Sequence, residues 1–384
     1  MSTRRHIRSL ILGATAVLLT AGSTYSLDTL YVLRPPQIWV LQDLNGDGDY
    51  LDFGETQVFA DGLPATSGDL ALHNGRLYVS SGADSILRVM DVNGDGDALD
   101  LGEVIEYARG SALPGSTGEI IALPDGSLLV SDLINPTLHL VRDLNGDDDA
   151  LDDGERRVVA AGLLSARGMS RRSDDRILVL TAAQATPVMI LHDRNGDDDY
   201  DDFAEAVSYV ENAIPGRDLV ALDSDVAFLT QPTEGGILVL RDLTRDGDAL
   251  DDGEIVLYAA GLLSPTAINI GRDGLYVLAG AAGKELMLIS DLNGDGDALD
   301  FGETLVVATG LMNAVSIAVE PPPDSQCLPG DMNADSAVNM ADVAVFAAAL
   351  AGESAVELCR ADINGDGLIN GLDVSAFVSR LLNG

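Results

Sequence analysis

Short runs of alternating apolar and polar residues recur along most of the chain and predict β-strands. Residues 66–110 show the pattern once. Runs at 69–73 and 76–80 flank Asn74-Gly75, a pair typical of a hairpin turn. Further runs at 86–90 and 104–107 flank an acidic loop. One unit of about 49 residues therefore contains four short strands.

The unit recurs at a fixed period, which indicates a repeat architecture. Six copies of the acidic loop begin at Asp43, Asp91, Asp143, Asp193, Asp242 and Asp291, in steps of 48, 52, 50, 49 and 49 residues. Four strands per unit are typical of a propeller blade. The first unit lacks its innermost strand, and a matching run appears after the sixth repeat at 315–319. That run would complete the first blade and close the ring. We predict an all-β six-bladed β-propeller over 27–320, which resembles other six-bladed bacterial propellers.

The chain is strongly acidic, with a formal net charge of −40 from 62 acidic and 22 basic residues. The six loops hold 35 of those acidic residues. Such loops repel themselves unless cations bind to them. The charge also argues against nucleic acid as a partner.

The acidic loops have the ligand pattern of calcium sites. In the first loop Asp43, Asn45 and Asp47 offer side-chain oxygens at alternate positions, and a turn glycine follows. Asp49 would offer its backbone carbonyl, its carboxylate or neither. Asp52, Glu55 or both must complete the site. The loops resemble the calcium hairpins of integrin-type propellers, although Asp52 stands tenth where those have a ninth residue.

The six copies are not identical. Asp148 and Asp198 replace the turn glycine in the third and fourth loops, and Thr244 and Arg245 replace Asn and Gly in the fifth, which we expect to be the weakest site. An acidic hairpin that merely stays solvated is the alternative to ion binding. Bound ions would most simply have a structural role, with about one Ca²⁺ per loop. The candidate ligands are Asp43, Asn45, Asp47, Asp49, Asp52, Glu55, Asp91, Asn93, Asp95, Asp97, Asp100, Glu103, Asp143, Asn145, Asp147, Asp149, Asp152, Glu155, Asp193, Asn195, Asp197, Asp199, Asp202, Glu205, Asp242, Thr244, Asp246, Asp248, Asp251, Glu254, Asp291, Asn293, Asp295, Asp297, Asp300 and Glu303.

The N-terminal segment has the features of a secretion signal. Arg4, Arg5 and Arg8 precede the apolar run 10–21, which is short for a membrane span, and small residues follow. We predict that 1–26 is a signal peptide and that the mature protein is secreted, with no later membrane span. In an exported chain the only two cysteines, Cys327 and Cys359, are expected to pair.

A Pro-rich linker at 321–326 precedes two related acidic segments that start at Asp331 and Asp362. A helical pattern follows each segment. Oxygen side chains stand at positions one, three, five, nine and twelve: Asp331, Asn333, Asp335, Asn339, Asp342, Asp362, Asn364, Asp366, Asn370 and Asp373. The module, placed at 327–384, resembles a type I dockerin. The resemblance implies a small α-helical domain, two Ca²⁺ ions at those residues and a cohesin-like partner.

The dockerin-like module departs from the usual pattern where cohesin is recognised. Cohesin-binding dockerins usually carry a Ser/Thr-like pair at positions ten and eleven of each segment. Here those positions hold Met340-Ala341 and Gly371-Leu372. A disulfide between Cys327 and Cys359 would clamp the two halves together.

The sequence supports three hypotheses for function. The first is a secreted calcium-binding scaffold or binding protein, and the second is a polysaccharide- or sugar-processing enzyme of hydrolase, lactonase or quinone-dependent dehydrogenase type. The third is an adhesin whose partner, a protein or a polysaccharide, bridges to the calcium ions of the propeller. No His/Asp/Glu cluster recurs in the connections expected at the channel mouth, so we name no catalytic or cofactor residue. Arg167, Arg171, Arg172 and Arg217 form either a small basic patch or a solvated face.

Overall fold

The computed structural model describes residues 27–320 except 82–84, 110–116, 133–134, 184–186, 212–213 and 281–283. It also describes parts of 330–381, including two helices. The predicted signal peptide, the linker and Cys327 lie outside the described residues. Among the described residues, no helix is long and apolar enough to cross a membrane.

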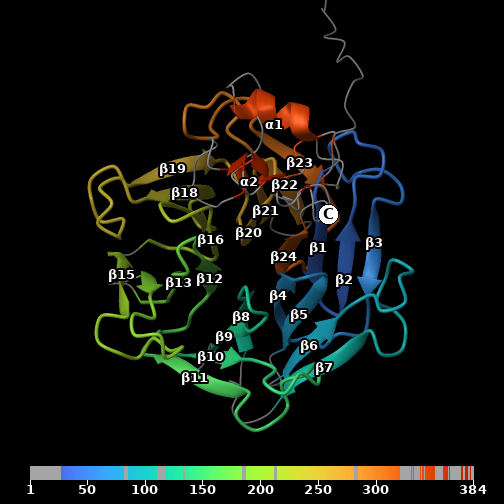
Figure 1. Ribbon diagram of the computed structural model, residues 1–384, viewed down its shortest axis with the longest axis vertical. Coiled ribbons are helices and arrows are strands. Elements are labelled where there is room, and N and C mark those ends of the chain that lie inside the picture. The colour runs from blue at the N-terminus through green and yellow to red at the C-terminus, as the bar shows by residue number, and fades with distance from the viewer. Residues whose placement is uncertain are drawn as a thin grey trace, which may run out of the picture.

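Six four-stranded antiparallel sheets form a ring of blades (Figure 1). From the innermost strand outwards, the sheets are β24 (Ser316–Glu320), β1 (Thr29–Arg34), β2 (Gln37–Leu41), β3 (Thr56–Ala60); β4 (Ser67–His73), β5 (Arg76–Ser81), β6 (Ser85–Val89), β7 (Val104–Arg109); β8 (Thr117–Ala122), β9 (Leu128–Asp132), β10 (Thr137–Val141), β11 (Arg156–Ala161); β12 (Gly168–Arg171), β13 (Ile177–Leu180), β14 (Val188–Leu191), β15 (Ala206–Val210); β16 (Leu219–Ala221), β17 (Val226–Gln231), β18 (Gly236–Arg241), β19 (Ile255–Ala260); and β20 (Ala267–Ile270), β21 (Leu275–Ala279), β22 (Glu285–Ile289), β23 (Thr304–Ala308).

The ring closes as the sequence predicts. Strand β24 pairs antiparallel with β1, with Val32 opposite Ile317, so the end of the propeller chain completes the first blade. The six-bladed fold is therefore confirmed. Closure leaves no unpaired inner strand.

The hydrophobic core lies between blades. Each cluster joins two neighbouring sheets, as where Leu33 and Ile38 of blade 1 pack with Leu70 and Val79 of blade 2. A further cluster joins blade 6 to blade 1 through Tyr276 and Leu30. Burying apolar faces between blades makes each blade depend on its neighbours.

The strand directions separate two faces of the disc. Because neighbouring strands are antiparallel, the acidic loops between third and fourth strands share a face with the turns between first and second strands. The connections between blades lie on the opposite face, which we call the mouth face. Both β1 and β24 meet the acidic-loop face at the ends where the chain enters and leaves the propeller.

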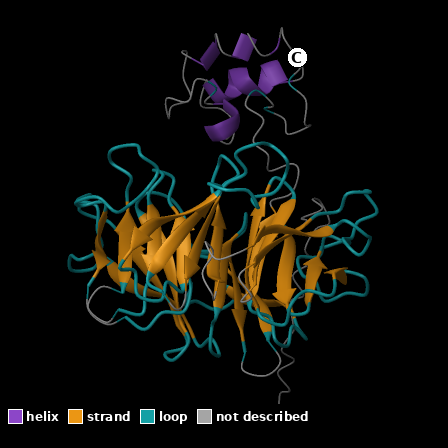
Figure 2. Cartoon of the chain, turned by 90° about the horizontal axis from the view of Figure 1, so that it is seen from below, coloured by secondary structure: helices purple, strands orange, loops and turns teal. Residues whose placement is uncertain are grey.

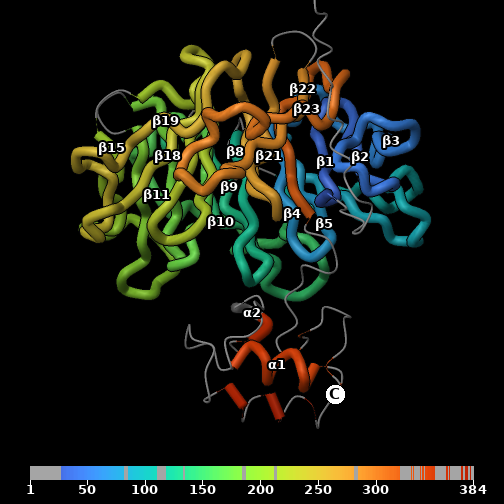
Figure 3. The backbone as a smooth tube through the Cα atoms, turned by 90° about the horizontal axis from the view of Figure 1, so that it is seen from above, coloured from blue at the N-terminus to red at the C-terminus, as the bar shows by residue number. Residues whose placement is uncertain are grey.

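The C-terminal module has a core of its own. Helices α1 (Asp342–Leu350) and α2 (Leu358–Ala361) lie outside the disc of strands in Figures 2 and 3. Phe346 and Phe377, each four residues after the closing Asp of its segment, pack with ring centroids 4.5 Å apart. Met332 and Ala361 complete this buried cluster.

Candidate metal centres and the channel mouth

The acidic loops fold around their own carboxylates. In the first loop Gly46 N–H donates to Asp43 Oδ1 at 2.6 Å, and Gly48 N–H donates to Oδ2 at 3.2 Å. Asn45 Oδ1 accepts the N–H of Asp47 at 2.8 Å. In the second loop, N–H donation led by Gly96 lowers the pKa of Asp91. These turns gather ionised oxygens along one side of the backbone.

The thirteenth residue, always Glu, holds the two ends of each loop together. Glu55 accepts the N–H of Leu44 on Oε1 and that of Asp52 on Oε2, both at 3.0 Å. The same pair of bonds recurs in all six loops, and each Glu is at most 3% exposed: Glu55, Glu103, Glu155, Glu205, Glu254 and Glu303. Burial raises the pKa of Glu254, but backbone donors led by Asp251 N–H outweigh it and lower the pKa overall. Glu254 therefore stays charged although it is buried.

Three carboxylates converge in the first loop and again in the third. Oxygens of Asp43, Asp47 and Glu55 lie within 4.8 Å of one another, as do those of Asp143, Asp147 and Glu155. The tenth residue has a different partner, because Asn45 Nδ2 donates to Asp52 Oδ2 at 2.6 Å. Four other loops repeat that amide bond. This geometry favours Glu55 over Asp52 as the residue that completes the candidate site.

The dockerin-like segments contain the same closing arrangement. Asp342 Oδ1 accepts the N–H of Met332 at 2.7 Å, and Asp373 Oδ1 accepts that of Ile363 at 2.9 Å. In both cases the last acidic residue of the segment binds the amide of its second residue, as Glu55 does for Leu44. Asp342 and Asp373 are 0% exposed. The other eight candidate ligands of this module lie outside the described residues.

Each acidic loop also binds the preceding blade. The N–H of its eighth residue donates to a carbonyl of the outer strand next door at 2.6–2.9 Å. The six bonds run from Tyr50 to Val307, Ala98 to Phe59, Ala150 to Tyr107, Tyr200 to Val159, Ala249 to Tyr209 and Ala298 to Tyr258. The loops thus connect all six blades in a ring, including blade 1 to blade 6.

The two aspartates that replace the turn glycine add ion pairs between blades. Asp148 and Asp198 keep the left-handed conformation of the glycine, with φ of 75° and 65°. The Asp148 carboxylate pairs with Arg76 at 2.6 Å and with Arg88, whose side chain is 9% exposed. Asp198 Oδ2 lies 3.4 Å from Arg142 of blade 3. These substitutions strain the backbone but add inter-blade contacts.

We predict that Arg88→Met lowers the free energy of unfolding by about 1–3 kcal/mol. The substitution removes the nearly buried guanidinium group that pairs with the Asp148 carboxylate. Arg109→Met is the matched control. Arg109 is 65% exposed, and among the described residues its ion pair is with Glu106 of its own strand. Its loss should therefore cost about 0–1 kcal/mol. Urea unfolding measures both variants. Equal effects would show that the inter-blade pair contributes nothing special.

The fifth loop departs from the common geometry where its sequence differs. Arg245 takes a φ of 62°, a conformation that glycine adopts more easily. Asp246 N–H now donates to Asp242 Oδ1 at 3.2 Å. Thr244 has no amide with which to hold the tenth residue. The backbone and hydrogen bonds of the fifth loop thus differ from those of the other loops. That its site binds calcium most weakly stays a prediction.

We predict that Asp143→Ala costs more stability than Asp242→Ala when calcium is present, by about 1–2 kcal/mol. Both substitutions remove the first carboxylate of a loop, and only the third loop has the full ligand set. Thermal unfolding with calcium and with chelator separates the ion-dependent part. A larger calcium-dependent loss for Asp242→Ala would contradict the ranking.

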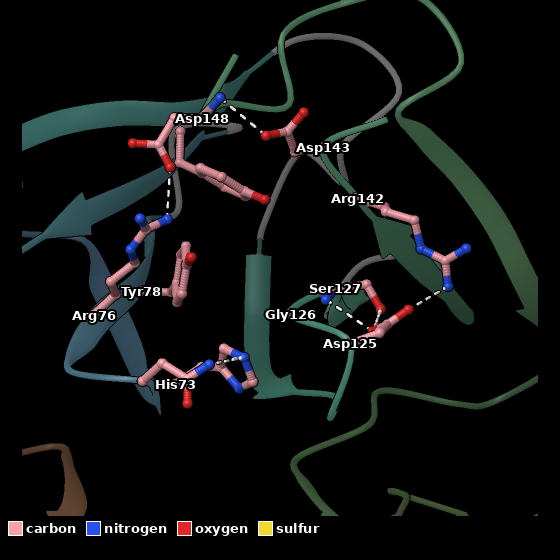
Figure 4. A pocket seen from close by; sticks show the side chains of 11 residues that line it. His73, Arg76, Tyr78, Asp125, Gly126, Ser127, Arg142, Asp143 and Asp148 are labelled. Atoms are coloured by element: carbon pink, nitrogen blue, oxygen red, sulfur yellow. Dashed lines mark hydrogen bonds and ion pairs between the residues drawn. The ribbon is translucent and has the colours of Figure 1, made fainter. Parts of the chain in front are cut away.

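A polar hollow of about 440 Å³ lies beside the third loop, between blades 2 and 3 (Figure 4). Its charged lining residues pair with one another. Arg76 binds Asp148, and Arg142 Nη2 donates to Asp125 at 2.7 Å. The first of these pairs links blades 2 and 3, and the second lies within blade 3.

The structure places an acidic cluster at the channel mouth that sequence reasoning missed. Asp69, Glu119 and Asp218 begin the inner stretches of blades 2, 3 and 5, and each donates its backbone N–H to a Ser or Thr hydroxyl at 2.9–3.0 Å. Asp69 Oδ2 accepts the N–H of Ile120 and Asp218 Oδ2 that of Ile268, so both bridge to the next blade. The sequence signal for this cluster is that Asp69 and Glu119 stand one repeat apart at the starts of inner strands.

The three carboxyls interact with one another. Burial, followed by the charge of Asp69, raises the pKa of Glu119 well above its usual range. Burial and then Asp69 also raise the pKa of Asp218 to about 7. Glu119 also hydrogen-bonds to Asp69. Part of the cluster is therefore protonated near neutral pH.

The predicted basic patch is divided between two faces. Arg171 and Arg172, at the end of β12, pair with Asp175 and Asp174. Arg167 and Arg217 precede inner strands at the opposite end, on the mouth face, and are exposed. The patch is thus two pairs of arginines with different surroundings.

Comparisons with known proteins agree with the two-part architecture. Residues 329–382 match the family model of the dockerin type I domain. A search of curated proteins finds no match. Among solved structures, a chain of a nidogen/laminin complex is 17% identical over 76% of this chain and 97% of its own, with a TM-score of 0.53.

Two bacterial structures are more distant. A gluconolactonase from Xanthomonas campestris is 14% identical over 64% of this chain and 76% of its own, with a TM-score of 0.44. A protein of unknown function from Bacteroides caccae is 14% identical over 77% and 99%, with a TM-score of 0.48. Similarity at this level concerns the fold alone. The chain is a six-bladed β-propeller with a dockerin type I domain at residues 329–382.

Proposed function

We propose that the protein is a secreted, calcium-stabilised propeller that serves as an extracellular binding scaffold and is attached through its dockerin domain. The recurring geometry of the six loops supports the calcium part. Each buries a glutamate that accepts two backbone N–H groups, and in two loops this glutamate lies within 4.8 Å of two aspartates. Converging carboxylates are unfavourable without a cation. Hard oxygen donors at alternate positions suit Ca²⁺.

In this proposal the residues that hold each ion are the first, third, fifth and thirteenth of the loop, which in the first loop are Asp43, Asn45, Asp47 and Glu55. The bound ion supplies positive charge and fixes the loop. The backbone of the same loop binds the preceding blade through its eighth residue. Calcium binding therefore stabilises the joints between blades as well as the hairpins.

The dockerin domain supports attachment outside the cell, because dockerin type I domains bind calcium and cohesin partners. The two closing residues, Asp342 and Asp373, are buried and already hold the backbone of their segments. Met340 is 73% exposed where a cohesin-reading hydroxyl is usual. We therefore propose a partner of the cohesin class that contacts an apolar residue at this position.

A pull-down of the full chain with a panel of cohesin modules tests attachment. We expect weak, calcium-dependent retention, because the usual Ser/Thr pairs are missing. The double variant Asp342→Ala/Asp373→Ala is the control and should show none. Retention in calcium no greater than that of the double variant would contradict attachment. Tight retention would show instead that positions ten and eleven matter less than we propose.

A further inference from the structure

The single lysine of the chain lies at the channel mouth and has no carboxylate partner among the described residues. Lys284 Nζ donates to Thr266 Oγ1 at 2.9 Å and to the carbonyl of Ala314. Its side chain is half-buried. An ammonium group with only neutral partners, in a chain of charge −40, is an unusual arrangement that the fold does not require.

Lys284 extends a basic arc that spans three consecutive blades. Arg167 N–H bonds to Leu180 O, Arg217 N–H to Thr230 O and Thr266 N–H to Leu278 O, so these residues occupy equivalent positions in blades 4, 5 and 6. Lys284 contacts the third of them. Arg167 and Arg217 make no ion pair within 4.0 Å among the described residues. We call Arg167, Arg217 and Lys284 the basic arc.

The opposite side of the mouth is acidic. Gly68 and Gly118 precede Asp69 and Glu119, at the position that Arg217 occupies in blade 5. Glycine at both positions leaves this side of the mouth without the positive charge that Arg217 carries in blade 5. Arg217 acts electrostatically on both sides, because it lowers the pKa of Lys284, after burial, and also opposes the upward shift at Glu119.

A hollow adjoins the basic arc between blades 4 and 5. Its volume is about 350 Å³, and its lining includes Arg167, Ile214, Pro215 and Gly216, which immediately precedes Arg217. A space of this size accommodates one or two sugar-sized rings. The mouth thus combines positive charge, hydrogen-bonding carboxyls and a place for the body of a ligand.

We propose that the basic arc binds the carboxylate of a small hydroxylated acid, such as a sugar acid, whose hydroxyl groups contact the carboxyl cluster. A singly charged carboxylate fits better than a phosphate dianion, because Asp218 directly follows Arg217 in the chain and Asp69 is near enough to act electrostatically on Asp218. Both carboxyls repel added negative charge. Hydroxyl groups fit because carboxyls both accept and donate hydrogen bonds when part of the cluster is protonated. This inference goes beyond the calcium-stabilised scaffold and does not depend on the ions in the loops.

Isothermal titration of the full chain with D-glucuronate, in millimolar calcium at neutral pH, tests the proposal. We expect saturable binding of glucuronate with a dissociation constant below about 10 mM. We expect no binding of D-glucose, which lacks the carboxylate, or of D-glucosamine, which carries the opposite charge. Glucuronate oligomers form a second arm. If the oligomers bind more tightly than glucuronate, the ligand is a polymer. If both bind equally, the ligand is the free acid. Absence of glucuronate binding, or equal binding of glucose, would overturn the proposal.

Variants locate the site. Lys284→Met should weaken glucuronate binding at least tenfold, whereas Lys284→Arg, which keeps the charge, should stay within a few-fold. Arg109→Met removes one positive charge from the exposed outer strand and should change nothing. An unchanged affinity in Lys284→Met would exclude the basic arc. If the variants and the unaltered protein have equal melting temperatures in calcium, their fold is intact. A loss of glucuronate binding is then distinguishable from a failure of the calcium proposal.

Discussion

Chelation of calcium should lower the melting temperature of the full chain by roughly 15 °C or more. Extracellular calcium sites often have dissociation constants of about 10⁻⁴–10⁻³ M. At about 5 mM calcium, each occupied loop then adds roughly 1–2 kcal/mol to the free energy of unfolding. Five or six loops add roughly 5–12 kcal/mol, a large fraction of the stability of most domains. The effect should be cooperative, because each loop also binds the preceding blade.

The aromatic residues allow the propeller to be followed by itself. Trp39 and every tyrosine precede residue 321, and the dockerin region contains neither type. Tryptophan fluorescence and near-ultraviolet circular dichroism therefore report propeller unfolding while the dockerin domain remains silent. Chelator already saturated with calcium is the control for the additive. An unchanged propeller transition in chelator would contradict a structural role for calcium.

Glu155→Gln should cost about 2–4 kcal/mol in calcium and abolish most of the ion contribution of the third loop. Both carboxylate oxygens of Glu155 bind backbone N–H groups at 2.9 Å, and the residue is 2% exposed. An amide keeps one acceptor, turns the other into a donor aimed at an N–H group and removes the charge next to Asp143 and Asp147. The difference between calcium and chelator in urea unfolding measures the two parts.

Asp153→Asn is the matched control in the same loop. It makes the same chemical change two residues earlier, at an exposed position, so it should change stability by less than about 0.5 kcal/mol. The variant Asp152→Asn separates the two candidate closing residues. If Asp152→Asn removed the calcium dependence and Glu155→Gln did not, the assignment of the closing ligand would be wrong.

The sequence was sufficient to predict the ring of blades, because the strand pattern repeats about every 49 residues. The run near Leu30 lacked an inner neighbour in its own unit, and closing the ring pairs it with the run near Val319. The same regularity located the acidic loops. Strand number and ring closure follow from patterns repeated six times, which a single irregular blade does not obscure.

Contacts between repeats were beyond the sequence pattern. Nothing in Ala150 itself indicates that its N–H binds Tyr107 of another blade. The sequence shows that Asp148 replaces the turn glycine, but its pairing with Arg76 and Arg88 becomes visible only with the positions of both blades. The closing residue stayed open for the same reason, because spacing does not show which carboxylate turns inwards.

The channel mouth shows a third limit. The sequence pattern places Asp69 at the start of a strand and singles out neither Glu119 nor Asp218. Only the ring brings the three together. Lys284 lies far from Thr266 and Ala314 in chain order but touches both. A cluster assembled from one residue per repeat is visible only after the repeats are closed into a circle.

A crystal structure of the full chain grown in calcium, with anomalous diffraction data, tests the central claim most directly. The account predicts an anomalous peak enclosed by Asp43, Asp47 and Glu55, equivalent peaks in the other loops and the weakest or no peak in the fifth. Well-ordered loops without any metal peak, with their glutamates still holding the backbone, would show that the hairpins need no ion and would contradict the account.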